Sequence, residues 1–209
     1  FDEPFADSSA VPTYYVSELT RDHVVVALTG DGGDELFAGY DRYPTVHNLR
    51  RFDGMPTFLR KAISGPIAKL VPGKAESSFT RRLRNRMQIM GGTPSQRYCN
   101  WVTSFPLSLR SELYHTEWSQ QFNELEQGAF ISELFSSSSL DDGGLSAMRT
   151  DLRSYLPCDL LAKVDITSMA HGLECRSPFL DHKVVETAGK FKFAEMTQPG
   201  RTKPILTDT

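Results

Sequence analysis

The first part of the chain has apolar residues at helical spacing. They recur every four positions between residues 8 and 22, as one face of an α-helix requires. These apolar residues are Val11, Tyr15 and Leu19. Ser8 or Ser9 supplies an oxygen suited to an N-cap, and Pro12 lies close enough to the start to be tolerated. The pattern predicts a helix over residues 8–22 with a buried apolar stripe.

The next segment has the pattern of a strand followed by a glycine loop. Residues 23–29 form a short, continuously apolar and β-branched run, typical of a strand buried on both faces in a parallel sheet. Residues 30–35 are acidic and rich in glycine, and residues 36–40 open another helix. This order predicts an open α/β fold, in which ligands bind at the carboxyl ends of the strands.

Strand patterns nearly disappear after this loop. Residues 44–135 are predicted to be helical, with breaks at proline and glycine, and residues 136–144 to form a loose polar surface loop. Three later helices are predicted: 146–155, 158–171 after a break at Pro157, and 182–190 capped by Asp181. We expect residues 1–209 to be mainly helical with one or two strands, as part of one α/β domain with a parallel sheet.

Composition and charge exclude several classes of protein. A chain of 209 residues with 39% hydrophobic residues can bury a core of its own. The net charge of −3 argues against a general nucleic-acid binder. The longest apolar run, residues 24–28, is far shorter than the roughly 20 residues that span a bilayer. The chain starts at Phe1 and stops within an apolar pattern, so we expect a piece of a longer protein. Unpaired cysteines and the lack of a signal-peptide pattern indicate that this protein is cytoplasmic.

The cysteines, histidines and basic residues add little specific chemistry. Three cysteines without a CxxC pair favour reduced thiols over a disulfide framework or a cysteine-based zinc site. Five histidines without an HExxH motif give no support to a zinc hydrolase. One dense basic run, residues 81–86, is either a solvated helix face or a contact for phosphate or an acidic partner.

Two interpretations suit the acidic glycine loop at residues 29–35. Its glycines let a ligand approach the backbone, and its amides suit a phosphate. Its carboxylates (Asp31, Asp34 and Glu35) would repel a bare phosphate, so a bridging cation such as Mg²⁺ is required. The alternative is a turn whose acidic residues stabilise the start of the following helix. The loop matches neither GxGxxG nor the P-loop.

Several spaced motifs together resemble the synthetase domain of the asparagine synthetase family, which belongs to the ATP-pyrophosphatase group. Residues 29–40 read TGDGGDELFAGY, and residues 1–9 read FDEPFADSS. Later motifs are KVD at 163–165, SMA at 168–170, ECRSPFLD at 174–181 and GRTK at 200–203. The resemblance therefore extends over the whole chain.

The resemblance implies ATP-dependent amide synthesis. A substrate carboxylate attacks the α-phosphate of Mg-ATP, which gives an acyl-adenylate and pyrophosphate. Ammonia then displaces AMP, and a separate glutaminase domain normally releases that ammonia from glutamine. The implied substrates are aspartate, ATP and ammonia or glutamine, the implied cofactor is Mg²⁺, and a homodimer is possible.

The resemblance also assigns roles to individual residues. Thr29 and Gly30 match positions that contact AMP, and Asp31 matches a catalytic carboxylate, where the family more often has Glu. Asp34 matches a magnesium ligand, and Glu35 is assigned a structural role.

Residues outside the loop receive less definite assignments. Asp7 and Ser8 lie near a loop associated with the acceptor substrate. Lys163 and Arg176 either neutralise phosphates or form structural ion pairs; the candidate acidic partners are Asp165, Glu174 and Asp181.

Parts of the family pattern are missing from these residues. The first pyrophosphate loop, of the SGGLDS type, should lie upstream of Phe1, and a catalytic lysine should lie downstream of Lys203. We therefore expect residues 1–209 alone to be inactive and to bind Mg-ATP weakly. A related amidotransferase with another acceptor carboxylate and a non-catalytic module remain alternatives.

Overall fold

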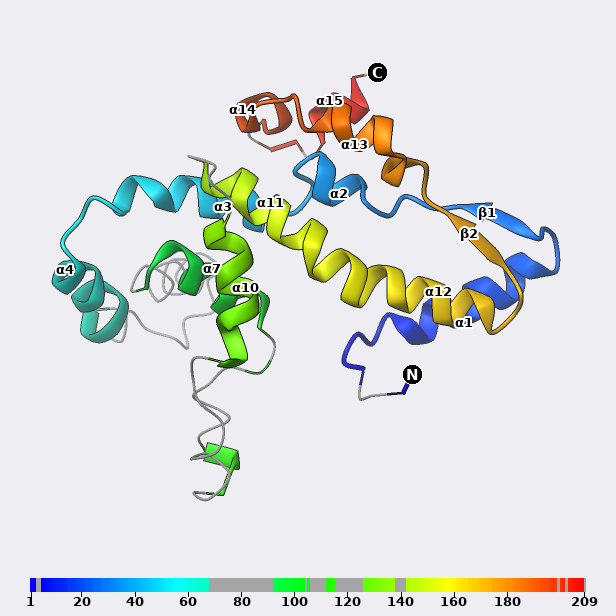
Figure 1. Cartoon of the computed structure of the whole chain (residues 1–209), viewed down its shortest axis with the longest axis horizontal. Helices are drawn as coiled ribbons and strands as arrows, with labels where there is room; N and C mark the ends of the chain where they lie inside the picture. The colour runs from blue at the N-terminus through cyan, green and yellow to red at the C-terminus, as the bar shows by residue number, and fades with distance from the viewer. Residues whose placement is uncertain are drawn as a thin grey trace. The chain divides into compact units, whose positions relative to one another are not determined.

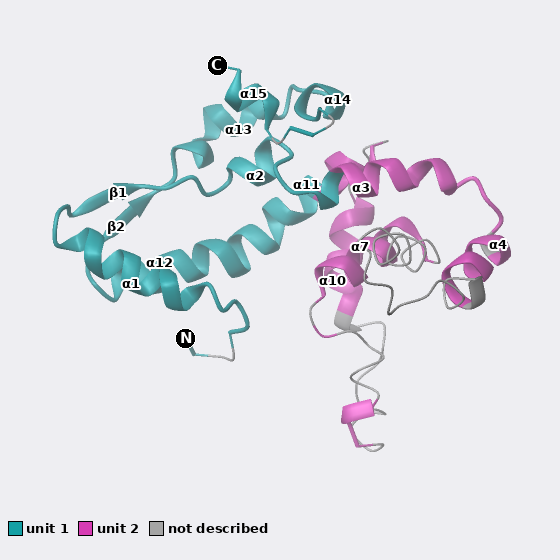
Figure 2. Cartoon of the chain, turned by 180° about the vertical axis from the view of Figure 1, so that it is seen from behind, with its two compact units in different colours: residues 1–43, 148–209 teal, residues 44–147 magenta. Residues whose placement is uncertain are grey.

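The computed structural model describes most of the chain. It describes residues 1–2, 5–67, 92–103, 105, 112–115, 126–137, 142–198, 200–201 and 203–208. At positions 57, 66, 67, 126 and 127 it describes the backbone alone. The chain divides into two compact units (Figure 2): unit 1 comprises residues 1–43 and 148–209, and unit 2 comprises residues 44–147. The basic run 81–86 lies outside the described residues. The assignment of the chain to one domain remains a prediction.

Unit 1 contains a parallel sheet. Strand β1 (Val26–Leu28) pairs with β2 (Glu174–Arg176), and Ala27 lies opposite Cys175 (Figure 1). This confirms the predicted fragment of an α/β fold, mainly helical with one or two strands; the described residues contain two, and they are parallel. The expected burial of the first strand on both faces is wrong, because Leu28 is 74% exposed and Val26 is 40% exposed. Within the described part of the chain, β1 has only one neighbouring strand to cover it.

The first predicted helix is present, but its orientation differs from the prediction. Helix α1 (Ala10–Arg21) packs along α12 (Ala162–Met169). The apolar stripe expected to be buried is exposed: Val11 is 63%, Tyr15 58% and Leu19 66% exposed. The buried residue of α1 is Ser17, whose hydroxyl donates to the Thr13 carbonyl. This bond within the helix satisfies the hydroxyl, so Ser17 can be buried while the apolar stripe stays exposed.

The chain stays helical across Pro157. Helix α11 (Gly143–Arg153) leads to the π-helix η3 (Leu156–Leu161), which continues into α12. The predicted break is wrong because Pro157 lies in the first turn of η3, where its missing N–H is tolerated. Residues 143–144, the last part of the predicted loose loop 136–144, are helical as well, because they begin α11. Asp142 Oδ1 accepts from the Gly144 N–H at 2.8 Å and stabilises the start of α11.

Short helices cover the end of the sheet in unit 1. They are α2 (Gly33–Leu36), η4 (Pro178–Leu180), α13 (His182–Ala188), α14 (Phe193–Met196) and α15 (Pro204–Thr207). Leu36, Phe37 and Ala188 form their buried core, against which Phe179 and Ile205 pack. Asp181 caps α13 through the Lys183 N–H, as predicted. This core fixes the acidic glycine loop at the carboxyl end of β1.

The described elements of unit 2 are helical, as predicted for residues 44–135. They include most of α3 (Arg42–Leu49), η1 (Arg50–Phe52), α4 (Thr57–Ala62), η2 (Ile63–Ile67), α7 (Pro94–Val102) and α10 (Glu126–Ser137). Helices α7 and α10 pack together, and the Tyr98 ring stacks on Phe135 with 5.2 Å between centroids. No helix in the described ranges is long and apolar enough to cross a membrane.

Candidate functional site

The glycine loop is attached to the segment that follows β2. The Thr29 N–H donates to the Arg176 carbonyl at 2.8 Å, and the Thr29 hydroxyl lies 2.6 Å from the Ser177 hydroxyl. The carboxyl ends of two parallel strands therefore lie side by side (Figure 1). The structure thus brings together the TGDGGDE and ECRSPFLD motifs, which are far apart in the sequence.

The glycines of the loop differ in what a side chain at their positions would meet. Gly32 has φ +86°, and a Cβ there would overlap Leu180 Cδ2 and lie 3.0 Å from Leu180 Cγ. A Cβ at Gly33 would touch the Phe179 ring at 3.4 Å. At Gly30, a Cβ would meet no atom of the described residues within 4 Å. Gly32 is therefore required by the backbone and by packing, whereas Gly30 borders open space that a ligand can approach.

Asp34 forms an ion pair with a residue from the other end of the chain. Lys203 Nζ lies 2.8 Å from Asp34 Oδ1, and both side chains are about one-third exposed. A Cβ at Gly39 would overlap Asp34 Oδ1 and lie 2.6 Å from Lys203 Cε. The glycine at position 39 therefore leaves the space in which this pair forms. The GRTK motif thereby contacts the loop that carries the predicted magnesium ligand.

Asp31 has a carboxylate oxygen with no partner. Its Oδ2 is buried, and no donor within the described part of the chain bonds to it. A buried acceptor without a hydrogen bond is rare in folded proteins and calls for an explanation. A cation or a hydrogen-bond donor at this position would satisfy the oxygen.

Glu35 points into the protein. It is 1% exposed, and the Tyr40 hydroxyl donates to its Oε1 at 3.0 Å. Burial raises the pKa of Glu35, because the charged form loses its water. Burial and the neighbouring Glu35 carboxylate also raise the pKa of Tyr40. This placement agrees with the structural role expected for Glu35.

A second ion pair, with a buried carboxylate, lies next to Tyr40 in unit 1, and the sequence analysis did not identify it. Asp151 is 1% exposed and accepts from the Arg42 guanidinium and from the Tyr43 hydroxyl, each at 2.6 Å. Arg42 also lies over the Tyr40 ring, 4.0 Å from its centroid. The available signal was an acidic residue within the helix predicted over residues 146–155, since a carboxylate that becomes buried there needs a cationic or hydrogen-bonding partner.

Lys163 forms an ion pair, but not with the partners proposed for it. Its Nζ donates to Asp7 Oδ2 at 2.6 Å and to the Ser9 hydroxyl at 2.7 Å. The expected partners Asp165, Glu174 and Asp181 are wrong for Lys163, because Asp7 lies against it on the N-terminal side of α1. The hydrogen bond from Lys163 lowers the pKa of Asp7 to about 2.

Arg176 and Ser8, for which the sequence suggested roles outside the loop, form local hydrogen bonds. Arg176 donates to Glu174 Oε1 at 2.7 Å, and this pair is exposed, so the ion-pair alternative is confirmed there. Ser8 accepts from the Val11 N–H through its carbonyl at the start of α1.

Residues 1–209 match the family model described as asparagine synthase. The chain belongs to the asparagine synthase family. It is 34% identical over 209 residues to asparagine synthetase (glutamine-hydrolyzing) 1 of Bacillus subtilis, covering 99% of this chain and 31% of the relative. A putative asparagine synthetase (glutamine-hydrolyzing) of Mycobacterium tuberculosis is 33% identical over 192 residues, 90% of this chain and 27% of the relative.

A shorter match involves a putative asparagine synthetase (glutamine-hydrolyzing) 2 of Methanocaldococcus jannaschii, 48% identical over 60 residues, 29% of this chain and 12% of the relative. The chain thus spans about a third or less of the length of these curated relatives. No solved structure gives a significant match.

Among the described residues of this asparagine synthase family chain, the carboxylates can be compared with what a metal site requires. The described residues contain no group of three or more histidine, cysteine or acidic side chains that could hold an ion by themselves. Mg²⁺ commonly binds one or two carboxylates and completes its shell with water and substrate phosphates. Asp34 lies within the loop, is partly exposed and is paired through Oδ1 with Lys203, and it matches that pattern as a single protein ligand. It does not fit a cage built only from protein groups.

Proposed function

We propose that this chain is part of the synthetase domain of an enzyme that converts aspartate to asparagine at the expense of ATP. The observation that carries the proposal is the acidic glycine loop at the carboxyl end of β1, with open space at Gly30 and an unpartnered oxygen on Asp31. Nucleotides bind at this edge of open α/β sheets. The names of the relatives support asparagine as the product.

The proposed reaction has two steps. The β-carboxylate oxygen of aspartate attacks the α-phosphorus of ATP, and pyrophosphate leaves, which gives β-aspartyl-adenylate. Ammonia then attacks the acyl carbon, loses a proton and displaces AMP to form the amide. We propose that the ammonia comes from glutamine, through a glutaminase domain that lies outside residues 1–209.

Each loop residue has a proposed task. Thr29 and Gly30 contact the AMP portion of the nucleotide, with Thr29 oriented by Ser177. Asp31 is the proposed catalytic carboxylate, positioned toward the adenylate or the incoming ammonia. Asp34 would hold Mg²⁺, which supplies charge neutralisation on the phosphates when bound. Lys203, paired with Asp34, keeps this carboxylate oriented.

A direct experiment tests the proposal. The protein is expressed from its complete gene and supplied with Mg-ATP, ammonia and aspartate, and the products are measured by mass spectrometry. We expect asparagine, AMP and pyrophosphate in equal amounts. The Asp34→Asn variant is expected to lose about hundredfold in kcat/KM, since metal stabilisation of transition-state charge amounts to several kcal/mol. The exposed Asp22→Asn variant is the matched control.

Other outcomes would contradict parts of the proposal. Turnover only with a different carboxylate would refute aspartate as the acceptor while retaining the nucleotide chemistry. The absence of nucleotide turnover with every acceptor would contradict the enzymatic function and leave a binding or structural module.

A further inference from the structure

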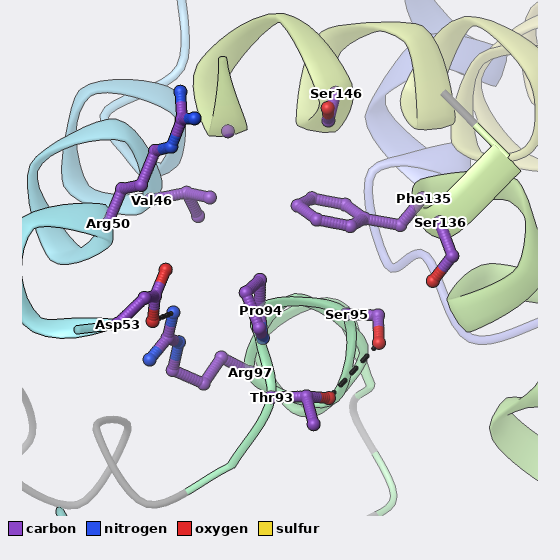
Figure 3. A pocket seen from close by; sticks show the side chains of 11 residues that line it. Val46, Arg50, Asp53, Thr93, Pro94, Ser95, Arg97, Phe135, Ser136 and Ser146 are labelled. Atoms are coloured by element: carbon purple, nitrogen blue, oxygen red, sulfur yellow. Dashed lines mark hydrogen bonds and ion pairs between the residues drawn. The ribbon is translucent and has the colours of Figure 1, made fainter. Parts of the chain in front are cut away.

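Polar side chains that line a cavity in unit 2 bond to one another. The cavity has a volume of about 470 Å³ (Figure 3). In its wall the Arg97 guanidinium donates to Asp53, and the Thr93 hydroxyl lies 3.2 Å from the Ser95 hydroxyl. The polar cluster around Arg42 in unit 1 is different, because one of its members bonds to the acidic glycine loop.

Arg42 is held by a carboxylate and by aromatic rings. Its Nε and Nη2 both donate to Asp151 Oδ2, at 2.9 and 2.6 Å. The guanidinium carbon lies 4.0 Å from the centroid of the Tyr40 ring and 5.0 Å from that of the Tyr155 ring. A guanidinium is flat and carries several donors, so it can bond to a carboxylate and stack on a ring at the same time. A lysine ammonium has no flat face, so these contacts require an arginine.

Tyr40 connects the Arg42 cluster to the loop. Its hydroxyl donates to Glu35 Oε1 at 3.0 Å, and Glu35 is 1% exposed. The attraction between the Arg42 cation and the Tyr40 ring holds that ring in one orientation. The direction of the hydroxyl is thereby fixed as well. Contacts therefore run without a break from Asp151 through Arg42 and Tyr40 to Glu35.

The orientation of Glu35 determines that of Asp34. The two residues are consecutive in α2, and successive helical residues point about 100° apart. With Glu35 directed into the protein, Asp34 is directed outward, and its side chain is about one-third exposed. A helix of four residues has few hydrogen bonds of its own, so its direction depends on the side chains that anchor it. Leu36 and Phe37 supply apolar anchors, and the bond from Tyr40 to Glu35 supplies a directional polar one.

We propose that Arg42 is a positioning residue for the carboxylate that binds magnesium. It fixes the Tyr40 ring, Tyr40 fixes Glu35, and α2 then presents Asp34 in the direction that a metal-bound nucleotide requires. Arg42 acts through Tyr40 and not by contact with nucleotide or substrate. The inference rests on the function proposed above, because that function assigns Asp34 to Mg²⁺.

Two tyrosines provide matched variants. The Tyr40 hydroxyl donates to Glu35, whereas the Tyr43 hydroxyl donates to Asp151 at 2.6 Å. Tyr40→Phe and Tyr43→Phe each remove one hydrogen bond to a buried carboxylate and keep the ring. We expect both variants to be less stable toward urea. Only Tyr40→Phe should weaken Mg-ATP binding, by about tenfold, the smaller of the effects observed when a group that orients a metal ligand is removed.

Arg42→Lys tests the arginine itself. The variant keeps a positive charge beside Asp151 but loses the flat face over the Tyr40 ring, so it should also weaken Mg-ATP binding about tenfold. Binding is measured by calorimetry on the protein expressed from its complete gene, without aspartate, at low and at saturating Mg²⁺. Saturating Mg²⁺ should restore the affinity of both Tyr40→Phe and Arg42→Lys, because the defect lies in metal binding. General damage to the fold would not be restored in this way.

The double variant Tyr40→Phe/Arg42→Lys shows whether Arg42 acts through Tyr40. If it does, the double variant should bind Mg-ATP as Tyr40→Phe alone does, because the second change has no further path to Asp34. A loss equal to the product of the two single losses would overturn the proposal. Unchanged affinity in Arg42→Lys, or equal weakening by Tyr40→Phe and Tyr43→Phe, would overturn it as well.

The comparison of the two tyrosine variants decides alone if Arg42→Lys does not fold. Each of these contrary results would leave the proposed function intact, since the unaltered protein still binds Mg-ATP. An unaltered protein that does not bind Mg-ATP would instead contradict the proposed function, and the positioning role of Arg42 with it.

Discussion

Lys163 Nζ lies 2.6 Å from Asp7 Oδ2, although the two residues are 156 positions apart in the sequence. Lys163 is nearly buried on α12, and Asp7 precedes α1. The pair therefore fixes the segment before α1 against α12. Burial, together with the nearby negative charge of Asp7, raises the pKa of Asp159. Asp7 thus has a defined position near α12.

Removal of this pair should lower stability in a pH-dependent manner. Asp7→Asn is expected to cost about 2 kcal/mol near neutral pH, less than for a fully buried pair, because Asp7 is partly exposed. The Asp7 pKa of about 2 lies below that of an unfolded aspartate, so the pair stabilises the fold above about pH 4. That contribution is lost as the pH falls toward 2. Urea unfolding between pH 3 and 7 measures it, with Asp22→Asn as the control.

The glycines of the loop should respond differently to substitution. Gly32→Ala is expected to cost about 2 to 3 kcal/mol, from positive φ and overlap with Leu180. Gly30→Ala should leave stability within about 0.5 kcal/mol, since its added methyl group meets open space. If Gly30 borders the nucleotide, Gly30→Ala should still weaken ATP binding. Unfolding and ATP titrations on both variants measure the two effects, and a stable Gly32→Ala protein would contradict this account.

Gly39→Ala should separate Asp34 from Lys203 without unfolding the protein. The added methyl group overlaps Asp34 Oδ1 and crowds Lys203 Cε, both at the ends of side chains that can move. We expect a stability loss of about 1 kcal/mol, the scale of a partly exposed ion pair with mild overpacking. The magnesium concentration for half-maximal activity should rise. Gly54→Ala, where nothing lies within 4 Å, is the control and should change neither quantity.

Glu35 should give a pH dependence opposite to that of Asp7. Its pKa in the folded protein is raised by burial, so the unfolded state ionises more readily. Stability should therefore fall as the pH rises above about 4.5 and level off above the folded-state pKa. Glu35→Gln keeps an acceptor for Tyr40 and should remove this fall. Unfolding measured from pH 4.5 to 8 tests the expectation, with the exposed Glu18→Gln as control; an unchanged slope in Glu35→Gln would contradict it.

Local features of the fold could be predicted from the sequence. The β-branched run before Gly30, the acidic glycine loop and the Asp181 cap each depend on residues adjacent in the chain, and each is present. The parallel sheet was also predicted, because a continuously apolar strand that leads into such a loop is typical of α/β folds. These features need no knowledge of which distant segments meet.

The remaining features depend on contacts between distant segments. The periodicity of Val11, Tyr15 and Leu19 predicted a helix correctly but not its covered face, because the buried residue of α1 is Ser17. The partner of Lys163 could not be predicted from nearby acidic residues, since Asp7 becomes adjacent only in the folded chain. The same holds for Arg42 and Asp151, which lie 109 residues apart.

The pairing of β1 with β2 has a consequence during synthesis. Thr29 and Ser177, which join the ends of the two strands, are separated by 148 residues. At about 5–20 residues per second, a ribosome needs about 7–30 s to make the intervening chain. For that interval β1 lacks β2, and the backbone edge that pairs with β2 is open to nascent-chain chaperones or to neighbouring polypeptides. The acidic glycine loop, which is bonded to Arg176 and Ser177, can acquire its final shape only after β2 has been translated.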